Sequence, residues 1–200
     1  MKKGSGVLGA KGTEKIVFFI VLIFLLSNSL AFAVEKPEPF GLKLGVTTKS
    51  TALSIISNEG GKVVSQGYKI VKGDVLNTNV EGVEVKKLPV DDLIKATFWF
   101  YKGLLYRIEY TFPLSTSKEE FTVVYNQLKA KYGAPKKFVK PWLADGIAEW
   151  NFGDVVVRLF APWASWDMYL IYEHVPLSKE VEKSDQEVFK KETAKPKKGL

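Results

Sequence analysis

Groups suited to nucleophilic or metal chemistry are few, because the 200 residues include one histidine and no cysteine. Nucleophilic catalysis needs a nucleophile, a base and an orienting group, whereas a metal site needs several ligands together. His174 ends an expected strand without such a cluster, so we expect a structural place near the surface. The glycines at 4–12 and 60–61 lack the Lys-Ser/Thr pair of a phosphate-binding loop. This pattern predicts no enzyme activity, no cofactor and no metal.

Carboxylates are the remaining candidates for catalysis. Asp91 and Asp92 fall in an expected turn, and Glu119 and Glu120 are explained by helix capping. Two acids from distant parts of the chain could still meet as a glycosidase-type pair, because such a pair leaves no mark in the sequence. We expect a non-enzymatic protein, with a hydrolase as the alternative.

Aromatic residues are the informative excess, at 13% of the chain. Two apolar runs within 96–112, separated by Lys102-Gly103, predict an antiparallel hairpin whose glycine supplies the positive φ of a tight turn. One face is expected to carry Trp99, Tyr106, Ile108, Tyr110 and Phe112, and the other Phe98, Phe100 and Leu105. Both faces are apolar. One should cover the helices, while the other is either covered by another part of the chain or exposed.

Rigid aromatic rings and arginine on an exposed surface are typical of protein-binding sites, because they bury a large area at little entropic cost. The residues expected to bind a partner are Trp99, Tyr106, Arg107, Trp163 and Trp166. The last two lie in a loop, where exposure is most expected. Core packing is the alternative for the other rings. A small-ligand or lipid cavity lined by aromatic residues, between sheet and helices, is a second functional hypothesis.

The elements that would position these residues alternate between helix and strand. A helix is expected over 48–58, capped by Thr47 or Thr48 and ended by Gly60-Gly61. A second is expected over 117–132, with a Ser117–Glu120 capping box and Gly133 at its end. Short strands are expected at 40–44, 62–66, 68–71, 75–80 and 83–88.

A second hairpin is predicted around a Gly153-Asp154 turn. Its register sets Trp150 opposite Val157 and Glu149 opposite Arg158, which gives one apolar face and an ion pair on the wetter face. A last strand is expected at 168–174. Residues 177–200 are expected to form a charged tail, flexible or partly helical.

The two hairpins suggest an internal repeat. Each follows a helix that ends in glycine, and each returning strand carries an arginine, Arg107 or Arg158. The chain therefore predicts an α+β fold of two helix-plus-antiparallel-strand repeats, over 38–112 and 113–176. Convergence of two unrelated aromatic hairpins is the alternative. The turn-to-arginine distance differs by one residue, which predicts a bulge or a longer turn in one copy.

Two short motifs resemble those of small exported domains. Residues 42–47, LKLGVT, resemble the strand and helix opening of β-lactamase-inhibitor proteins and of SmpA/OmlA outer-membrane assembly lipoproteins, and residues 128–135, LKAKYGAP, resemble their helix ends. The resemblance implies helices packed on one face of an antiparallel sheet, with the other face available to a protein partner. Val46 replaces the usual methionine, and no cysteine is available for lipidation. An uncharacterised exported family with this fold is therefore expected.

The N-terminal segment predicts export. Residues 1–15 are polar and contain lysines, 16–26 are all apolar, and Ala31-Phe32-Ala33 offers the small residues that signal peptidase recognises. We expect a signal peptide over 1–33, with an uncleaved anchor as the alternative. The protein should be periplasmic or extracellular, and its partner another envelope protein. Nucleic acid is not expected as a partner, because lysine density rises only near the C-terminus. An alternative role for the basic tail 190–198 is electrostatic attraction to the envelope surface.

Overall fold

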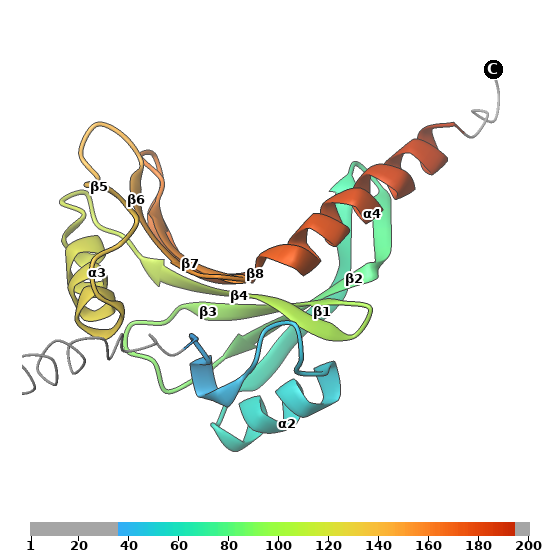
Figure 1. The fold of residues 1–200 in the computed structure, drawn as a ribbon, viewed down its shortest axis with the longest axis horizontal. Coiled ribbons are helices and arrows are strands. Elements are labelled where there is room, and N and C mark those ends of the chain that lie inside the picture. Colours follow the sequence, from blue (N-terminus) through green and yellow to red (C-terminus); the bar gives the residue numbers. More distant parts are fainter. Residues whose placement is uncertain (1–35, 195–200) are drawn as a thin grey trace, which may run out of the picture. The chain divides into compact units, whose positions relative to one another are not determined.

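The computed structural model describes residues 36–194, which belong to one compact unit that begins at Glu35. The predicted signal peptide and the end of the basic tail lie outside the described residues. The unit is α+β, as predicted, and its sheet has eight antiparallel strands in the order β1-β2-β3-β4-β8-β7-β6-β5 (Figure 1).

The chain runs twice through a helix followed by four strands. The first passage contains the short 3-10 turn η1 (Pro39–Gly41), α2 (Lys49–Asn58), β1 (Lys62–Lys72), β2 (Val75–Lys86), β3 (Lys95–Tyr101) and β4 (Leu104–Pro113). The second contains α3 (Glu119–Tyr132), β5 (Lys137–Val139), β6 (Gly146–Phe152), β7 (Val155–Ala161) and β8 (Asp167–His174), and α4 (Val175–Thr193) follows. Strands β4 and β8 pair at the middle of the sheet, so the two passages join there.

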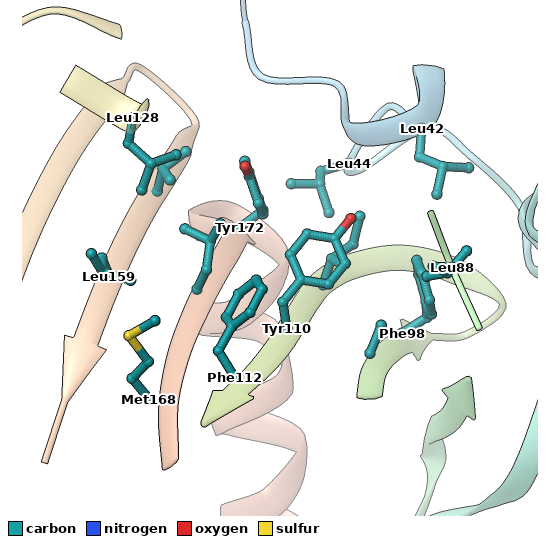
Figure 2. Close-up of a cluster of buried hydrophobic side chains, with 14 of the residues drawn as sticks. Leu42, Leu44, Leu88, Phe98, Tyr110, Phe112, Leu128, Leu159, Met168 and Tyr172 are labelled. Carbon is teal, nitrogen blue, oxygen red and sulfur yellow. The ribbon is translucent and has the colours of Figure 1, made fainter. Parts of the chain in front are cut away.

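The face of the sheet that contacts α2 and α3 carries the main apolar core, and we call it the core face. Phe98, Phe100 and Ile108 of the central strands are at most 1% exposed. Ile56 of α2 and Phe121 of α3 belong to the same cluster, whose centre is drawn in Figure 2. Burial of this apolar surface is the main source of stability for a domain without disulfides.

Residues 175–193 of the tail expected over 177–200 form helix α4, which confirms the helical alternative and corrects the flexible one. Val181 is buried with Val80, Tyr101 and Tyr106 in a second, smaller cluster, against which Leu177 packs. These strand residues alternate with those of the core, so α4 lies on the opposite face, and Figure 1 shows α2 and α4 on opposite sides of the sheet. The helices are therefore not confined to one face, because the tail supplies a third.

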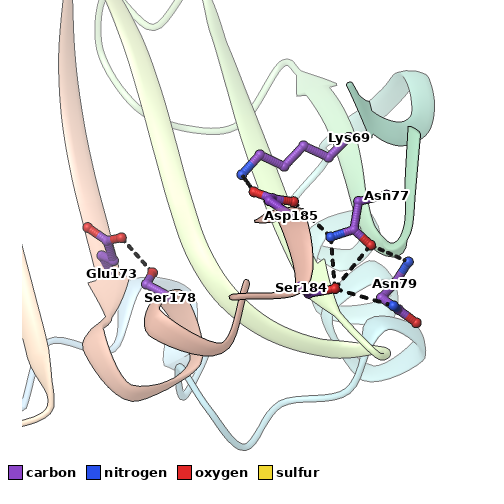
Figure 3. Close-up of polar contacts among 7 residues, drawn as sticks. All are labelled: Lys69, Asn77, Asn79, Glu173, Ser178, Ser184 and Asp185. Carbon is purple, nitrogen blue, oxygen red and sulfur yellow. Dashed lines mark hydrogen bonds and ion pairs between the residues drawn. The ribbon is translucent and has the colours of Figure 1, made fainter. Parts of the chain in front are cut away.

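Helix α4 is also fixed by polar contacts (Figure 3). The fully buried Asn77 donates from Nδ2 to Ser184 Oγ at 3.0 Å and to Asp185 Oδ1 at 2.7 Å. Lys69 Nζ lies 2.6 Å from Asp185 Oδ2. Such contacts require one orientation of the helix, since buried polar groups must find partners.

The sole histidine has a structural place at the start of α4. His174 Nδ1 accepts a hydrogen bond from the backbone N–H of Leu177 at 3.3 Å, which caps the helix. The ring also packs so closely on Gly45 that a Cβ there would lie 2.6 Å from Nε2. A residue expected merely to lie near the surface therefore joins α4 to the N-terminal segment.

The β3–β4 hairpin turns at Lys102-Gly103, as predicted, but its register differs from the expected one. Trp99 pairs with Arg107, whereas Phe100 pairs with Leu105, so Tyr106 is an extra residue in β4. This bulge moves Ile108, Tyr110 and Phe112 to the core face with Phe98, and it leaves Trp99 and Tyr106 on the other face. The prediction that both faces are largely apolar was wrong for that reason.

Other local predictions had mixed outcomes. The β6–β7 register is confirmed, including the pair Glu149–Arg158 at 3.0 Å. Thr48 caps α2, as expected. The prediction of a capping box at α3 was wrong, because the Glu120 carboxylate accepts hydrogen bonds from the N–H and the hydroxyl of Ser115 and not from Ser117. Residues 40–44 form no strand, and 62–88 form one long hairpin, β1–β2, instead of four short strands.

Candidate functional site

The predicted partner-binding residues separate into a buried set and an exposed set. Tyr106 is 4% exposed beneath α4, so it is unavailable to a partner. Burial also raises the pKa of its hydroxyl well above the usual range. Trp99 is half-buried against Gly82, where a Cβ would lie 2.8 Å from the ring. Arg107 is half-buried and pairs with Glu109 of its own strand.

Trp163 and Trp166, in the β7–β8 loop, form the exposed set. They are 57% and 72% exposed, and the 78% exposed Trp142 of the β5–β6 loop joins them. The three rings line one groove of about 340 Å³, completed by Thr116, Lys118, Ala164 and Ser165, which we call the tryptophan groove. Sequence reasoning missed Trp142. The available signal was its place in a connection, between Pro141 and the turn residues Asp145-Gly146.

The backbone of this groove is fixed although its rings are exposed. Asp145 Oδ1 accepts from the N–H of Trp163 at 2.7 Å, and the carbonyl of Trp166 accepts from the N–H of Leu114 at 2.7 Å. Lys118 Nζ donates to the carbonyl of Ser165 at 3.1 Å. Because both ends of the loop are held, little conformational entropy remains to be lost on binding.

A broad hollow lies on the face of the sheet that carries α4, and among the residues described it shares no lining residue with the groove. It has a volume of about 540 Å³ and is lined by parts of β1, β2, β3, β4 and β8, including Tyr68, Trp99, Glu109, Asp167 and Tyr169. We call it the sheet hollow. It begins at Asp167, directly after Trp166. The predicted residue Trp99 therefore lines the sheet hollow and not the tryptophan groove, while Tyr106 lines neither.

Residues 36–194 contain no group of three or more His, Cys, Asp or Glu side chains placed to hold a metal ion. Nor does this range contain a helix long and apolar enough to cross a membrane.

The model of one protein family, the TP0088 domain, matches residues 39–184. The chain belongs to the TP0088 domain family. The matched range begins at η1 and ends at Ser184, the last buried residue of α4, so the first half of that helix is part of the TP0088 domain. No curated protein and no solved structure matches the chain.

Proposed function

We propose that this TP0088 domain is an exported protein-binding module that uses the tryptophan groove as its anchor site, with the sheet hollow as a second exposed surface. The observation that carries the proposal is the meeting of Trp142, Trp163 and Trp166, from two separate loops, in one groove. Tryptophan is among the residues most enriched at the energetic centres of protein interfaces.

The exposed tryptophan rings are better explained by contact with a protein partner than by permanent exposure to water. Three large apolar side chains that stay more than half exposed cost free energy in water, and a partner would remove that cost. The prearranged loop backbone lowers the entropic cost of binding. Lys118, which lines the groove and donates to the Ser165 carbonyl, is the one charged residue among the described residues of its lining, so an apolar segment with an acidic residue would match it.

We also propose that the two passages of helix and four strands are an internal duplication. Their shared element order, and the pairing of their last strands β4 and β8 at the sheet centre, support this. The resemblance to β-lactamase-inhibitor and SmpA/OmlA proteins agrees with it. An exported location, with another envelope protein as partner, follows from the proposed signal peptide.

The test compares binding of envelope proteins by the full chain and by a variant with Trp142, Trp163 and Trp166 changed to alanine. A protein captured by cross-linking would be purified, and its Kd measured by calorimetry. We expect the triple variant to bind at least about 30-fold more weakly, because one interface hot spot contributes about 2 kcal/mol or more.

The control variant changes Val63, Ile70 and Leu76 to alanine, because these exposed apolar residues of the β1–β2 hairpin line neither the groove nor the hollow. It should bind within twofold of the parent chain. Equal binding by the tryptophan variant and the parent would refute the proposal.

A further inference from the structure

A cavity of about 470 Å³ lies on the core face and shares no described lining residue with the tryptophan groove or the sheet hollow. Its walls come from η1, the β2–β3 loop, α3 and the central strands β4 and β8. Apolar wall residues include Phe40, Val124, Leu128, Phe112 and Leu170. This size falls within the range of about 300–1,000 Å³ typical of small-molecule sites.

The cavity contains a polar group that lacks a protein partner. Tyr110 lines it and is 4% exposed, yet its hydroxyl has no hydrogen-bond partner among residues 36–194. A buried hydroxyl without a partner costs free energy, so such groups are rare and call for an explanation. Tyr172 also lines the cavity, and its ring meets that of Tyr110 edge to face at 5.9 Å. Figure 2 shows both rings rising from β4 and β8 into this space.

Both hydroxyls remain protonated at neutral pH, because burial raises the pKa of Tyr110 and of Tyr172 well above the usual value. The Tyr110 hydroxyl, which has no protein partner among residues 36–194, can therefore donate a hydrogen bond to an oxygen within the cavity. A protonated phenol can donate a hydrogen bond to either an alcohol or a carbonyl oxygen. The charges at the rim of the cavity therefore indicate whether the ligand is neutral or charged.

The rim disfavours anions. Three acidic residues, Asp91, Asp92 and Glu120, line the rim, whereas Lys131 is the single cation among the lining residues that the structure describes.

Two wall residues, Phe40 and Asp92, hold left-handed backbone conformations, with φ of 55° and 57°. Such conformations cost about 1–3 kcal/mol in non-glycine residues and often occur at binding sites.

We propose that this tyrosine cavity binds a small neutral amphiphile, whose apolar body fills the space between α3 and the sheet and whose oxygen accepts a hydrogen bond from the Tyr110 hydroxyl. The site uses none of the residues of the tryptophan groove. Each site can therefore be altered by substitutions that leave the lining residues of the other unchanged.

The test uses the full chain with N-phenyl-1-naphthylamine as a fluorescent probe, and 1-decanol and decanoate as competitors at pH 7.5. Bound probe should gain fluorescence, and 1-decanol should displace it at least tenfold more effectively than decanoate. Absence of probe binding, or equal or better displacement by decanoate, would overturn the proposal.

Two variants locate the site. Val124→Trp should fill the cavity and weaken probe binding at least tenfold, and Val123→Trp, which narrows the mouth from a 57% exposed position, serves if the first fails to fold. Tyr110→Phe should weaken 1-decanol binding at least fivefold while probe binding stays within twofold. The matched control is Tyr169→Phe, on the opposite face, which should change neither.

Unchanged binding in a folded cavity-filling variant, or unchanged 1-decanol binding in Tyr110→Phe, would refute the site. The triple tryptophan variant should keep full probe binding. Loss of partner capture with retained probe binding, or the reverse, thus separates failure of one proposal from failure of the other.

Discussion

The two faces of the sheet are stabilised in different ways. The core face carries a large apolar cluster that α2 and α3 complete, whereas the other face holds α4 through four buried apolar residues and a polar network around Asn77. The first arrangement gives bulk stability, and the second gives one helix a defined position. From this difference we infer that α4 is a separable layer, meaning that it can open while the sheet stays folded. The helix covers only part of its face of the sheet, and the sheet hollow lies uncovered on the same face.

The largest effect is expected on the core face. Phe98→Ala removes a side chain with 0% exposure from the centre of the cluster. Truncation of a buried phenylalanine typically costs about 3–5 kcal/mol, since it loses apolar burial and leaves a cavity. Urea unfolding monitored by circular dichroism would measure the loss. A change under about 1 kcal/mol would mean that the two faces do not differ as described.

Removal of the polar contacts of α4 should have a smaller and local effect. Asn77→Ala removes one hydrogen bond each from Ser184, which keeps a longer contact with Asn79, and from Asp185, which keeps Lys69, at a cost of about 1–3 kcal/mol. Hydrogen exchange should quicken along 175–193 while β3 and β4 keep their protection. Equal loss of protection across the sheet would show that α4 is no separable layer.

The unpartnered hydroxyl of the tyrosine cavity predicts an effect of opposite sign. Tyr110→Phe should raise the free energy of unfolding by about 1 kcal/mol without ligand, because an unsatisfied buried donor is removed and the ring is kept. Thermal unfolding of both forms measures this. A destabilised variant would show that the hydroxyl already has a good partner.

The smallest effect concerns pH at the start of α3. Burial alone would raise the pKa of Glu120, but hydrogen bonds from its own backbone N–H and from Ser115 outweigh burial and lower it. The folded state therefore prefers the ionised form, so this stabilisation is complete above the ordinary glutamate pKa of about 4.3 and is lost as pH falls through the lower folded value.

Glu120→Gln should remove this pH dependence, with a loss of about 0.3–1 kcal/mol at pH 7, as is usual for an acid in a first helical turn. Unfolding measured from pH 3 to 7 checks it. Glu119→Gln is the control for the helix-dipole part of this loss, because Glu119 lies in the same first turn whereas the hydrogen bonds from Ser115 go to Glu120. Identical pH profiles for the Glu120 variant and the parent would contradict the assignment.

Local sequence was sufficient to predict the structure wherever one residue or one turn determines it. Thr48 starts α2 because its hydroxyl can satisfy a free N–H, and Gly153-Asp154 fixes the β6–β7 register because strict alternation follows on both sides. The class, α+β with an antiparallel sheet, followed from these signals. The exposure of Trp163 and Trp166 was also predictable, because both lie in a loop.

Tertiary structure decided what depends on pairing between distant segments. The differing turn-to-arginine distances predicted a bulge or a longer turn in one of the two hairpins, and β4 has the bulge, but its place at Tyr106 was decided by the pairing of β4 with both β3 and β8. Helix α4 shows only a sparse stripe, Leu177, Val181 and Ser184, and its burial requires a sheet face that is already formed. The tryptophan groove and the tyrosine cavity likewise exist only where separate segments meet, so sequence determined their residues and the fold determined their sites.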